Sequence, residues 1–309
     1  MSTAVLARER PPDRPGPGPM PEALLRALDL QIGRRMDGLL AGEHRTAALG
    51  IGTELAQIRE WGPGDDVRRI DWNATARSLD VQVRVDVAER ALTSWVVLDI
   101  SPSMRFGTAD RRKWDVAEGV AVAMGHLASR RGNRIGITTF GGEGIVTLRP
   151  RQGRVGLLGV LLAVRREPET ERVGATSIGT ALSHVARVAR QRSLAVVVSD
   201  FRGPRDWRAA MLRLAARHAV VAVEIRDPRE QELPNVGHIW LVDPETGRKL
   251  HVDTAKRRLR ERFAAVAEEE RAGLARELAS LGVPHLVLST GGDWLRPFAR
   301  FVGNERKRR

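Results

Sequence analysis

The sequence predicts an α/β fold, a doubly wound and mostly parallel sheet that follows a smaller N-terminal segment. From residue 93 onward, short apolar runs rich in β-branched residues alternate with longer segments of helical periodicity. Strands that alternate with helices form βαβ units and therefore a parallel sheet. The runs are apolar throughout, which is typical of strands with both faces covered. These observations together favour a sheet with helices on each side.

The expected elements follow one another after Leu92. Short apolar runs predict strands at residues 95–98, 134–140, 145–148, 194–198, 219–225 and 285–288. Apolar stripes at helical spacing predict helices at residues 111–131, 156–164, 178–190, 207–217 and 254–281. The segments 238–242 and 249–252 indicate a hairpin, and the glycine-rich residues 141–144 indicate a turn between two strands.

Composition divides the chain into four parts. Residues 1–20 are rich in Pro, Arg and Gly, cannot bury a core and are expected to form a disordered arm. Residues 21–92 begin with a segment of helical periodicity and continue with a stretch rich in glycine and charge. Residues 93–292 form the expected α/β domain, and residues 293–309 are expected to form a basic C-terminal tail.

The overall charge is basic. The 309 residues include 51 Lys or Arg, 38 Asp or Glu and no Cys, which gives a net charge of +13 and excludes disulfides, zinc–thiolate sites and cysteine nucleophiles. Such a charge allows nucleic acid, anionic lipid or an acidic protein as partner. Because the basic residues are scattered and only 4% of residues are aromatic, we favour a solvated surface over a nucleic-acid site. No apolar run is long enough to span a membrane, and no signal-peptide segment is visible, so we expect a cytoplasmic protein.

Oxygen-bearing side chains follow two of the expected strands. Asp99, Ser101 and Ser103 come directly after one apolar run, and Asp200 comes after another. In an open parallel sheet, ligands bind beyond the carboxyl ends of the strands, where the strand order reverses. Thr176, in the loop before the helix at 178–190, can face the same crevice. Oxygen ligands suit a hard cation such as Mg²⁺, whereas the alternative is a strand-end turn with only local side-chain to backbone bonds.

This pattern of Asp-x-Ser-x-Ser, a later threonine and a later aspartate resembles the metal-ion-dependent adhesion site of von Willebrand factor A domains. The resemblance implies that Ser101, Ser103 and Thr176 contact Mg²⁺ (or Mn²⁺) directly or through water. It implies that Asp99 and Asp200 lie behind them and hold the ion largely through water. A carboxylate from a partner protein then completes the metal shell. Thr180, inside the expected helix, is the rival to Thr176.

The segment before the α/β domain extends the resemblance. Residues 52–77 contain the motifs GTEL, REW, PGDD and RRIDW, which are similar to the signature of the DUF58 family. Members of that family carry such a segment before a von Willebrand A-like domain, and here the resemblance covers about residues 45 to 230. Members often accompany MoxR-type AAA+ ATPases. The resemblance therefore implies an adaptor or assembly factor that works with such an ATPase.

Charged residues surround a turn signal, Pro63-Gly64, in this upstream segment. Acidic and basic side chains between residues 65 and 71 are expected to pair with one another. We expect the resulting corner to pack Trp61 and Trp72 against the sheet, with recognition of a partner as the alternative role.

The leading functional hypothesis is a metal-dependent protein-interaction module that is not an enzyme. The first alternative is a metal-dependent hydrolase or phosphatase, which we disfavour because the proposed loops hold no His or Cys to act as base or nucleophile, although an aspartate can act as a base. The second alternative is nucleic-acid binding through the basic surface. The sequence names neither the partner, nor the biological process, nor the oligomeric state.

Overall fold

The computed structural model describes residues 16–21, 49–87, 92–130, 132–142, 144–164, 177–203, 205–242 and 249–303. These residues form two compact units, residues 49–87 and residues 16–21 with 92–303. The helix expected to begin near residue 21 and the candidate ligand Thr176 lie outside the described residues.

A six-stranded sheet forms the centre of the larger unit. Its strands lie in the spatial order β10-β7-β6-β3-β4-β5, and all neighbours are parallel except β4 and β5. The strands are β3 (Thr93–Asp99), β4 (Arg134–Phe140), β5 (Val146–Gln152), β6 (Leu194–Ser199), β7 (Ala219–Arg226) and β10 (His285–Ser289). The predicted α/β fold class and its mostly parallel sheet are thus confirmed.

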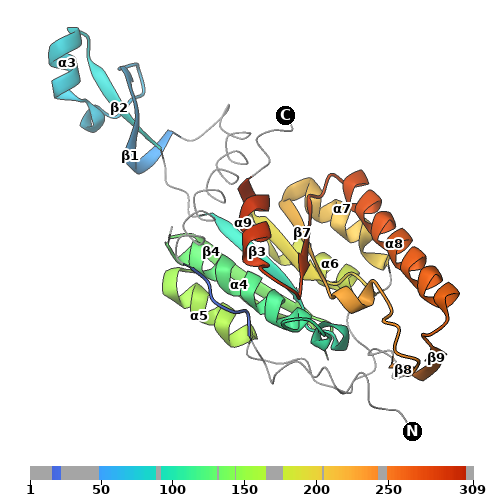
Figure 1. Ribbon diagram of the computed structural model, residues 1–309. Helices are drawn as coiled ribbons and strands as arrows, with labels where there is room; N and C mark the ends of the chain where they lie inside the picture. The colour runs from blue at the N-terminus through green and yellow to red at the C-terminus, as the bar shows by residue number, and fades with distance from the viewer. Residues whose placement is uncertain are drawn as a thin grey trace. The chain divides into compact units, whose positions relative to one another are not determined.

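Helices cover both faces of this sheet (Figure 1). They are α4 (Lys113–Arg130), α5 (Gly153–Val164), α6 (Ile178–Val188), α7 (Arg208–Arg217), α8 (Arg257–Ser280) and α9 (Leu295–Gly303). Apolar side chains of α6, α7 and α8 pack with one set of alternate strand residues, including Trp95 and Val97, in a single buried cluster. Helices α4 and α5 pack together on the opposite face. None of the described helices has both the length and the apolar composition needed to cross a bilayer.

Three short 3₁₀ helices and a hairpin complete the unit. They are η2 (Pro102–Arg105), η3 (Arg205–Trp207), η4 (Pro228–Glu230), and the strands β8 (His238–Val242) and β9 (Lys249–Asp253). Strands β8 and β9 pair antiparallel, as the sequence predicts. This hairpin and α8 lie between β7 and β10 along the chain.

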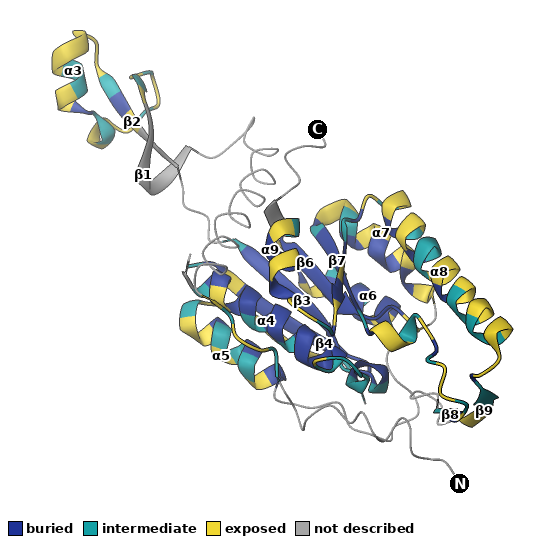
Figure 2. Ribbon diagram, in the orientation of Figure 1, coloured by how far each residue is buried: buried dark blue, intermediate teal, exposed yellow. Residues whose placement is uncertain are grey.

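The reversal of strand order lies between β3 and β6. The chain runs from β3 to β4 and β5 on one side, then returns to β6 on the other side of β3. Every residue of β3 and of β6 is buried (Figure 2), which explains their continuous apolar sequence. Because ligands of such sheets bind at this reversal, the carboxyl ends of β3 and β6 are the place where a site is expected.

The chain ends of this unit are more ordered than the sequence suggests. We expected a basic tail from residue 293, but α9 forms there and buries Trp294, Leu295 and Phe298. Trp294 Nε1 donates a hydrogen bond to the Pro17 carbonyl oxygen at 2.7 Å. Pro17, which belongs to the arm of residues 1–20 expected to be disordered, is therefore bonded to the residue that directly precedes α9.

The smaller unit is an antiparallel pair with a helical connection. Strand β1 (Leu49–Glu60) pairs with β2 (Gln82–Val87), and η1 (Val67–Arg69) and α3 (Trp72–Ser78) connect them. None of these elements was predicted, although valines at residues 81, 83, 85 and 87 alternate with polar residues, which is the pattern of a half-buried strand.

Ion pairs in this unit differ from the expected corner. Asp65 pairs with Arg59 of β1 at 2.6 Å, and Asp71 pairs with Arg84 of β2 at 2.8 Å. Asp71 also caps α3 by accepting hydrogen bonds from two backbone N–H groups. The predicted packing of the tryptophans is wrong for Trp72, which is 70% exposed. The helix that Asp71 caps begins at Trp72 and leaves this side chain at the surface.

Candidate functional site

Asp99, the last residue of β3, joins the ends of two neighbouring strands. Its Oδ1 accepts a hydrogen bond from the Ser101 backbone N–H at 2.8 Å. Its Oδ2 accepts from the hydroxyl of Ser199, the last residue of β6, at 2.5 Å. Asp99 is buried, so its carboxylate fixes the loop after β3 against the end of β6.

Two serine hydroxyls meet just beyond this carboxylate. The Oγ atoms of Ser101 and Ser103 lie 3.0 Å apart, and both residues are buried. Ser101 stands at the N-cap of η2, yet its side chain makes no capping hydrogen bond to the helix. Its hydroxyl instead contacts the side chains of Ser103 and Asp99, so the side-chain oxygens of this turn are gathered together and do not cap the backbone.

Asp200 lies beside the same hydroxyls. It follows β6, is buried, and accepts a hydrogen bond from Ser103. The structure thus brings together four of the five predicted site residues, Asp99, Ser101, Ser103 and Asp200, which we call the oxygen cluster.

The backbone after β6 holds Asp200 in a fixed orientation. Phe201 has a positive φ of 54°, a left-handed conformation that is uncommon for a residue other than glycine. Its N–H donates to Ser199 Oγ at 3.0 Å, and the Arg202 N–H donates to Asp200 Oδ1 at 3.1 Å. Such conformations persist where the surrounding structure over-determines them, commonly at functional sites.

Gly141 closes the oxygen cluster from the β4 side. It has a φ of +92°, and a Cβ atom placed on it would lie 2.6 Å from the Ser101 backbone nitrogen and 2.8 Å from Asp99 Oδ1. Only glycine lets the chain pass this close to the loop after β3. The sequence predicted the turn that contains Gly141 but not this contact.

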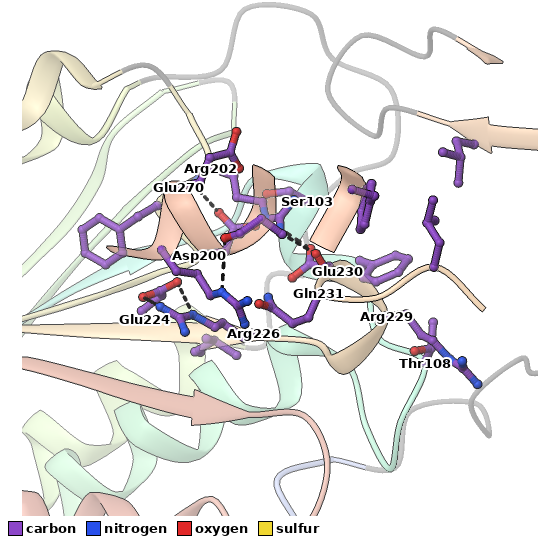
Figure 3. A pocket seen from close by; sticks show the side chains of 18 of the residues that line it. Ser103, Thr108, Asp200, Arg202, Glu224, Arg226, Arg229, Glu230, Gln231 and Glu270 are labelled. Atoms are coloured by element: carbon purple, nitrogen blue, oxygen red, sulfur yellow. Dashed lines mark hydrogen bonds and ion pairs between the residues drawn. The ribbon is translucent and has the colours of Figure 1, made fainter. Parts of the chain in front are cut away.

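Lys113 is the functional residue that the sequence analysis missed. It is fully buried in the first turn of α4, and its Nζ donates to Asp200 Oδ2 at 2.6 Å and to Glu230 Oε1 at 2.7 Å (Figure 3 shows the two acids). The ring centroid of Phe106 lies 5.8 Å from the same Nζ. A signal for it existed, because Lys113 stands four residues before Ala117 and so continues the apolar stripe of the predicted helix.

The two aspartates of the oxygen cluster differ in protonation. Burial, followed by the charge of Asp200, raises the pKa of Asp99 to about 7. Burial also acts to raise the pKa of Asp200, but the charge and hydrogen bond of Lys113 outweigh it, so this pKa lies below its ordinary value. Burial acts to lower the pKa of Lys113, while Asp200 and Glu230 raise it, with a net increase that keeps the ammonium charged.

The residues of the oxygen cluster fit a hard divalent cation. Octahedral Mg²⁺ with bonds of about 2.0–2.1 Å places neighbouring ligand oxygens about 2.8–3.0 Å apart. The two serine Oγ atoms, which form a hydrogen bond of 3.0 Å, could take such positions without moving apart. The Lys113 ammonium pairs with the carboxylates of Asp200 and Glu230, and Arg202 Nε lies 3.6 Å from Glu230 Oε1. Hydrogen bonds to neutral groups hold the Asp99 carboxyl group, so this is the group that an added cation would neutralise. Within the described ranges, no group of three or more His, Cys, Asp or Glu side chains is arranged around a metal position. A cation at this place would therefore depend on the serine hydroxyls.

Several solved structures are similar to this chain at low identity. The conserved hypothetical protein BatB from Bacteroides thetaiotaomicron is 15% identical with a TM-score of 0.47, and the match covers 70% of this chain and 99% of that one. The SpRpn10 VWA domain is 16% identical with a TM-score of 0.36, over 69% of this chain and 94% of that one.

Sequence relatives cover more of the chain. The uncharacterized protein Rv1480 of Mycobacterium tuberculosis is 39% identical over 287 residues, which are 92% of this chain and 90% of that protein. A Paracoccus denitrificans protein named "Uncharacterized protein in moxR 3'region" is 36% identical over 95 residues, which are 30% of this chain and 90% of that protein. The sequence model of the family described as "Protein of unknown function DUF58" matches residues 57–273. By this match over more than half of its length, the chain belongs to the DUF58 family.

Proposed function

We propose that this protein is a metal-dependent protein-interaction module. The oxygen cluster would hold Mg²⁺ or Mn²⁺ through Ser101 and Ser103, with Asp99 and Asp200 behind them and Thr176 as a further ligand. The bound ion would supply an open coordination position that accepts an acidic side chain of the partner. Binding, and not catalysis, is the activity that we assign to the protein.

The observation that carries this proposal is the meeting of two buried serine hydroxyls with two strand-end aspartates at the reversal of the sheet. Mg²⁺ dehydrates reluctantly and usually keeps several waters. A site with few direct protein ligands therefore binds it weakly until a partner carboxylate joins the shell. We therefore expect that the protein captures its partner only when the metal is present, and that it binds the metal tightly only when the partner is present.

A MoxR-type AAA+ ATPase is the partner that we propose, with this protein as its adaptor or assembly factor. The support is the resemblance described above and the name of the Paracoccus denitrificans relative, which refers to the region 3' of moxR. Because ATPase complexes assemble through protein contacts, this proposal predicts direct binding between two purified proteins.

The test is a pull-down with the full chain as bait and a purified MoxR-type ATPase from the same genome as prey. We expect capture in Mg²⁺, loss of capture in EDTA, and a decrease of at least about tenfold for Ser101→Ala, as for lost groups around other metal sites. Ser280→Ala, which removes an exposed hydroxyl outside the oxygen cluster, is the matched control and should bind like the unaltered protein.

Equal capture of the ATPase by Ser101→Ala and by the unaltered protein in Mg²⁺ would contradict the metal-dependent interaction. A phosphatase assay with Mg²⁺ and Mn²⁺ addresses the competing class of function. Turnover that Asp99→Ala abolishes would replace the binding module with an enzyme.

A further inference from the structure

A deep pocket opens directly beside the oxygen cluster. Its volume is about 660 Å³, and Ser103 and Asp200 form part of its lining (Figure 3). Binding pockets in proteins commonly have about 300–1,000 Å³, so this one is large enough for a ligand. The other walls come from the segment that follows β7, from β8 and from α8.

The apolar part of the lining is built by α8 and by β8. Helix α8 contributes Phe263, Ala267 and Leu274, which lie on one stripe of the helix because their spacing follows its turns. Ile239 and Leu241 of β8 line the same pocket. Apolar walls of this kind favour large apolar groups, whose burial contributes about 25 cal/mol per Å².

A buried acceptor in the lining has no partner. Gln231 Oε1 is shielded from solvent and makes no hydrogen bond within the described structure. A buried polar atom without a partner costs about 1–3 kcal/mol, and such atoms are rare. The oxygen is closed off in this conformation, so an N–H donor of a ligand would remove this cost when the Gln231 side chain turns toward the pocket.

The charged part of the lining adjoins the oxygen cluster. Five arginines and four acids line the pocket, Arg202, Arg205, Arg226, Arg229 and Arg271 with Asp200, Glu224, Glu230 and Glu270. Lys113, paired with two of these acids, adds a further positive charge behind them. Four of these arginines are paired with acids, Arg226 with Glu224, Arg202 with Glu230, Arg271 with Glu268 and Arg205 with Glu277. The lining is therefore close to balanced in charge, and the metal ion of the proposed function is what calls for an acidic group on the ligand.

We propose that this pocket binds a short peptide segment of a protein partner, in which an acidic side chain reaches the oxygen cluster and neighbouring large apolar side chains pack against α8 and β8. The peptide backbone supplies the N–H donor that Gln231 lacks. This inference rests on the proposed function, and it specifies the partner segment by its chemistry. The last residues of the chain, 304–309, do not fit this description, because four of the six are basic and none is apolar.

The experiment selects peptides on the immobilised full chain in Mg²⁺ from a phage-displayed library of random twelve-residue sequences. We expect enrichment of an Asp or Glu with Leu, Ile, Met, Phe or Trp within a few positions. Calorimetry then compares one selected synthetic peptide on the unaltered chain and on two Val→Glu variants. Val236 lines the pocket and is 38% exposed, whereas Val266 is 52% exposed on α8 and does not line it.

Val236→Glu should weaken peptide binding by at least about tenfold, which corresponds to about 1.4 kcal/mol, and Val266→Glu should not change it. Gln231→Leu should also weaken binding, because the hydrogen bond is lost. Three results would contradict the proposal that the pocket binds a peptide. They are equal affinity of the two valine variants, enrichment of peptides without apolar residues, and failure to select any peptide.

The two proposals can fail separately. If peptide binding requires the acidic residue and Mg²⁺ but is normal in Val236→Glu, the metal-dependent function is supported and the pocket is not the peptide site. If peptide binding is weakened by Val236→Glu but is equal in EDTA and in Ser101→Ala, the pocket is the peptide site and the metal-dependent function is wrong.

Discussion

The ends of β3 and β6 carry the same residue type at neighbouring positions of the sheet, but they differ in their surroundings. Asp99 is held by a backbone N–H and a serine hydroxyl. Asp200 is held by the buried ammonium of Lys113. The pKa of Asp99 is therefore raised to about 7, whereas that of Asp200 is lowered.

This difference shows which side of the oxygen cluster already has a cation. Lys113 neutralises the side of Asp200 and Glu230, while hydrogen bonds to neutral groups hold the side of Asp99. A second cation is thus best stabilised near Asp99 and the serine hydroxyls, since an opposite charge favours the ionised carboxylate. Three substitutions test this division of the cluster.

Removal of the Lys113 ammonium should cause the largest loss of stability. Lys113→Met leaves the buried carboxylate of Asp200 without its cation, and loss of one partner of a buried ion pair costs about 3–5 kcal/mol. Glu230 keeps Arg202, whose Nε lies 3.6 Å from Glu230 Oε1. We expect urea denaturation at pH 7 to report this decrease in the free energy of unfolding. Lys256→Met, at a lysine whose side chain is 73% exposed, is the control and should change stability little.

A double variant sharpens this result. Lys113→Met combined with Asp200→Asn removes the buried charge that Lys113→Met leaves unpaired, and should recover part of the lost stability, because the substitutions act within one network. If Lys113→Met alone is as stable as the unaltered chain, the ammonium does not hold this side of the cluster, and the comparison of the two aspartates is broken.

The protonation of Asp99 should appear as a pH dependence of stability in EDTA. The unfolded state releases the Asp99 proton near the ordinary pKa of 3.8, but the folded state retains it up to about pH 7. The folded state therefore binds more protons between these values, so the free energy of unfolding falls as pH rises through this window and levels above it. At about 1.4 kcal/mol per unit of pKa difference, the loss reaches at most about 4 kcal/mol.

Asp99→Asn should remove this contribution, so its stability relative to the unaltered chain should increase from pH 4 to pH 7, the window set by the raised pKa of Asp99. Denaturation curves at several pH values measure it. Asp80→Asn, at an exposed aspartate of the smaller unit, should leave the profile unchanged. A constant difference between Asp99→Asn and the unaltered chain across this range would show that Asp99 is already ionised at low pH.

The centre of the main sheet was predictable because strands such as β3 and β6 are buried on both faces and so read as uninterrupted apolar runs. Helix α9 was not, because Trp294, Leu295 and Phe298 stand among arginines that dominate the composition of the last residues. Strands β1 and β2 were missed for another reason. Strand β2 carries a clear alternation of valine and polar residues, but its partner β1 lies more than 20 residues earlier, and the charged residues between them drew the interpretation toward a turn.

The candidate site also contains residues that could be predicted from the sequence and residues that could not. Asp99, Ser101, Ser103 and Asp200 could be predicted, because the carboxyl ends of parallel strands meet at one edge of the sheet. Lys113 could not be assigned a role, since a lysine is almost never fully buried and is ordinarily taken as exposed. Its partner Glu230 is 117 residues away along the chain, and no local pattern indicates so distant an ion pair.

The smallest loss of stability should come from a substitution that displaces only Asp99 and the loop after β3. In Gly141→Ala, the new Cβ meets the Ser101 nitrogen and Asp99 Oδ1 at a residue whose φ is +92°. We expect a loss of about 1–3 kcal/mol in the free energy of unfolding, as for other overpacked positions, and weaker Mg²⁺-dependent capture of the partner because the serine hydroxyls shift. Gly144→Ala, where a Cβ meets no atom within 4 Å, is the matched control. Unchanged stability and capture in Gly141→Ala would mean that the loop after β3 adapts freely, and that its close fit to β4 does not set the positions of the serine hydroxyls.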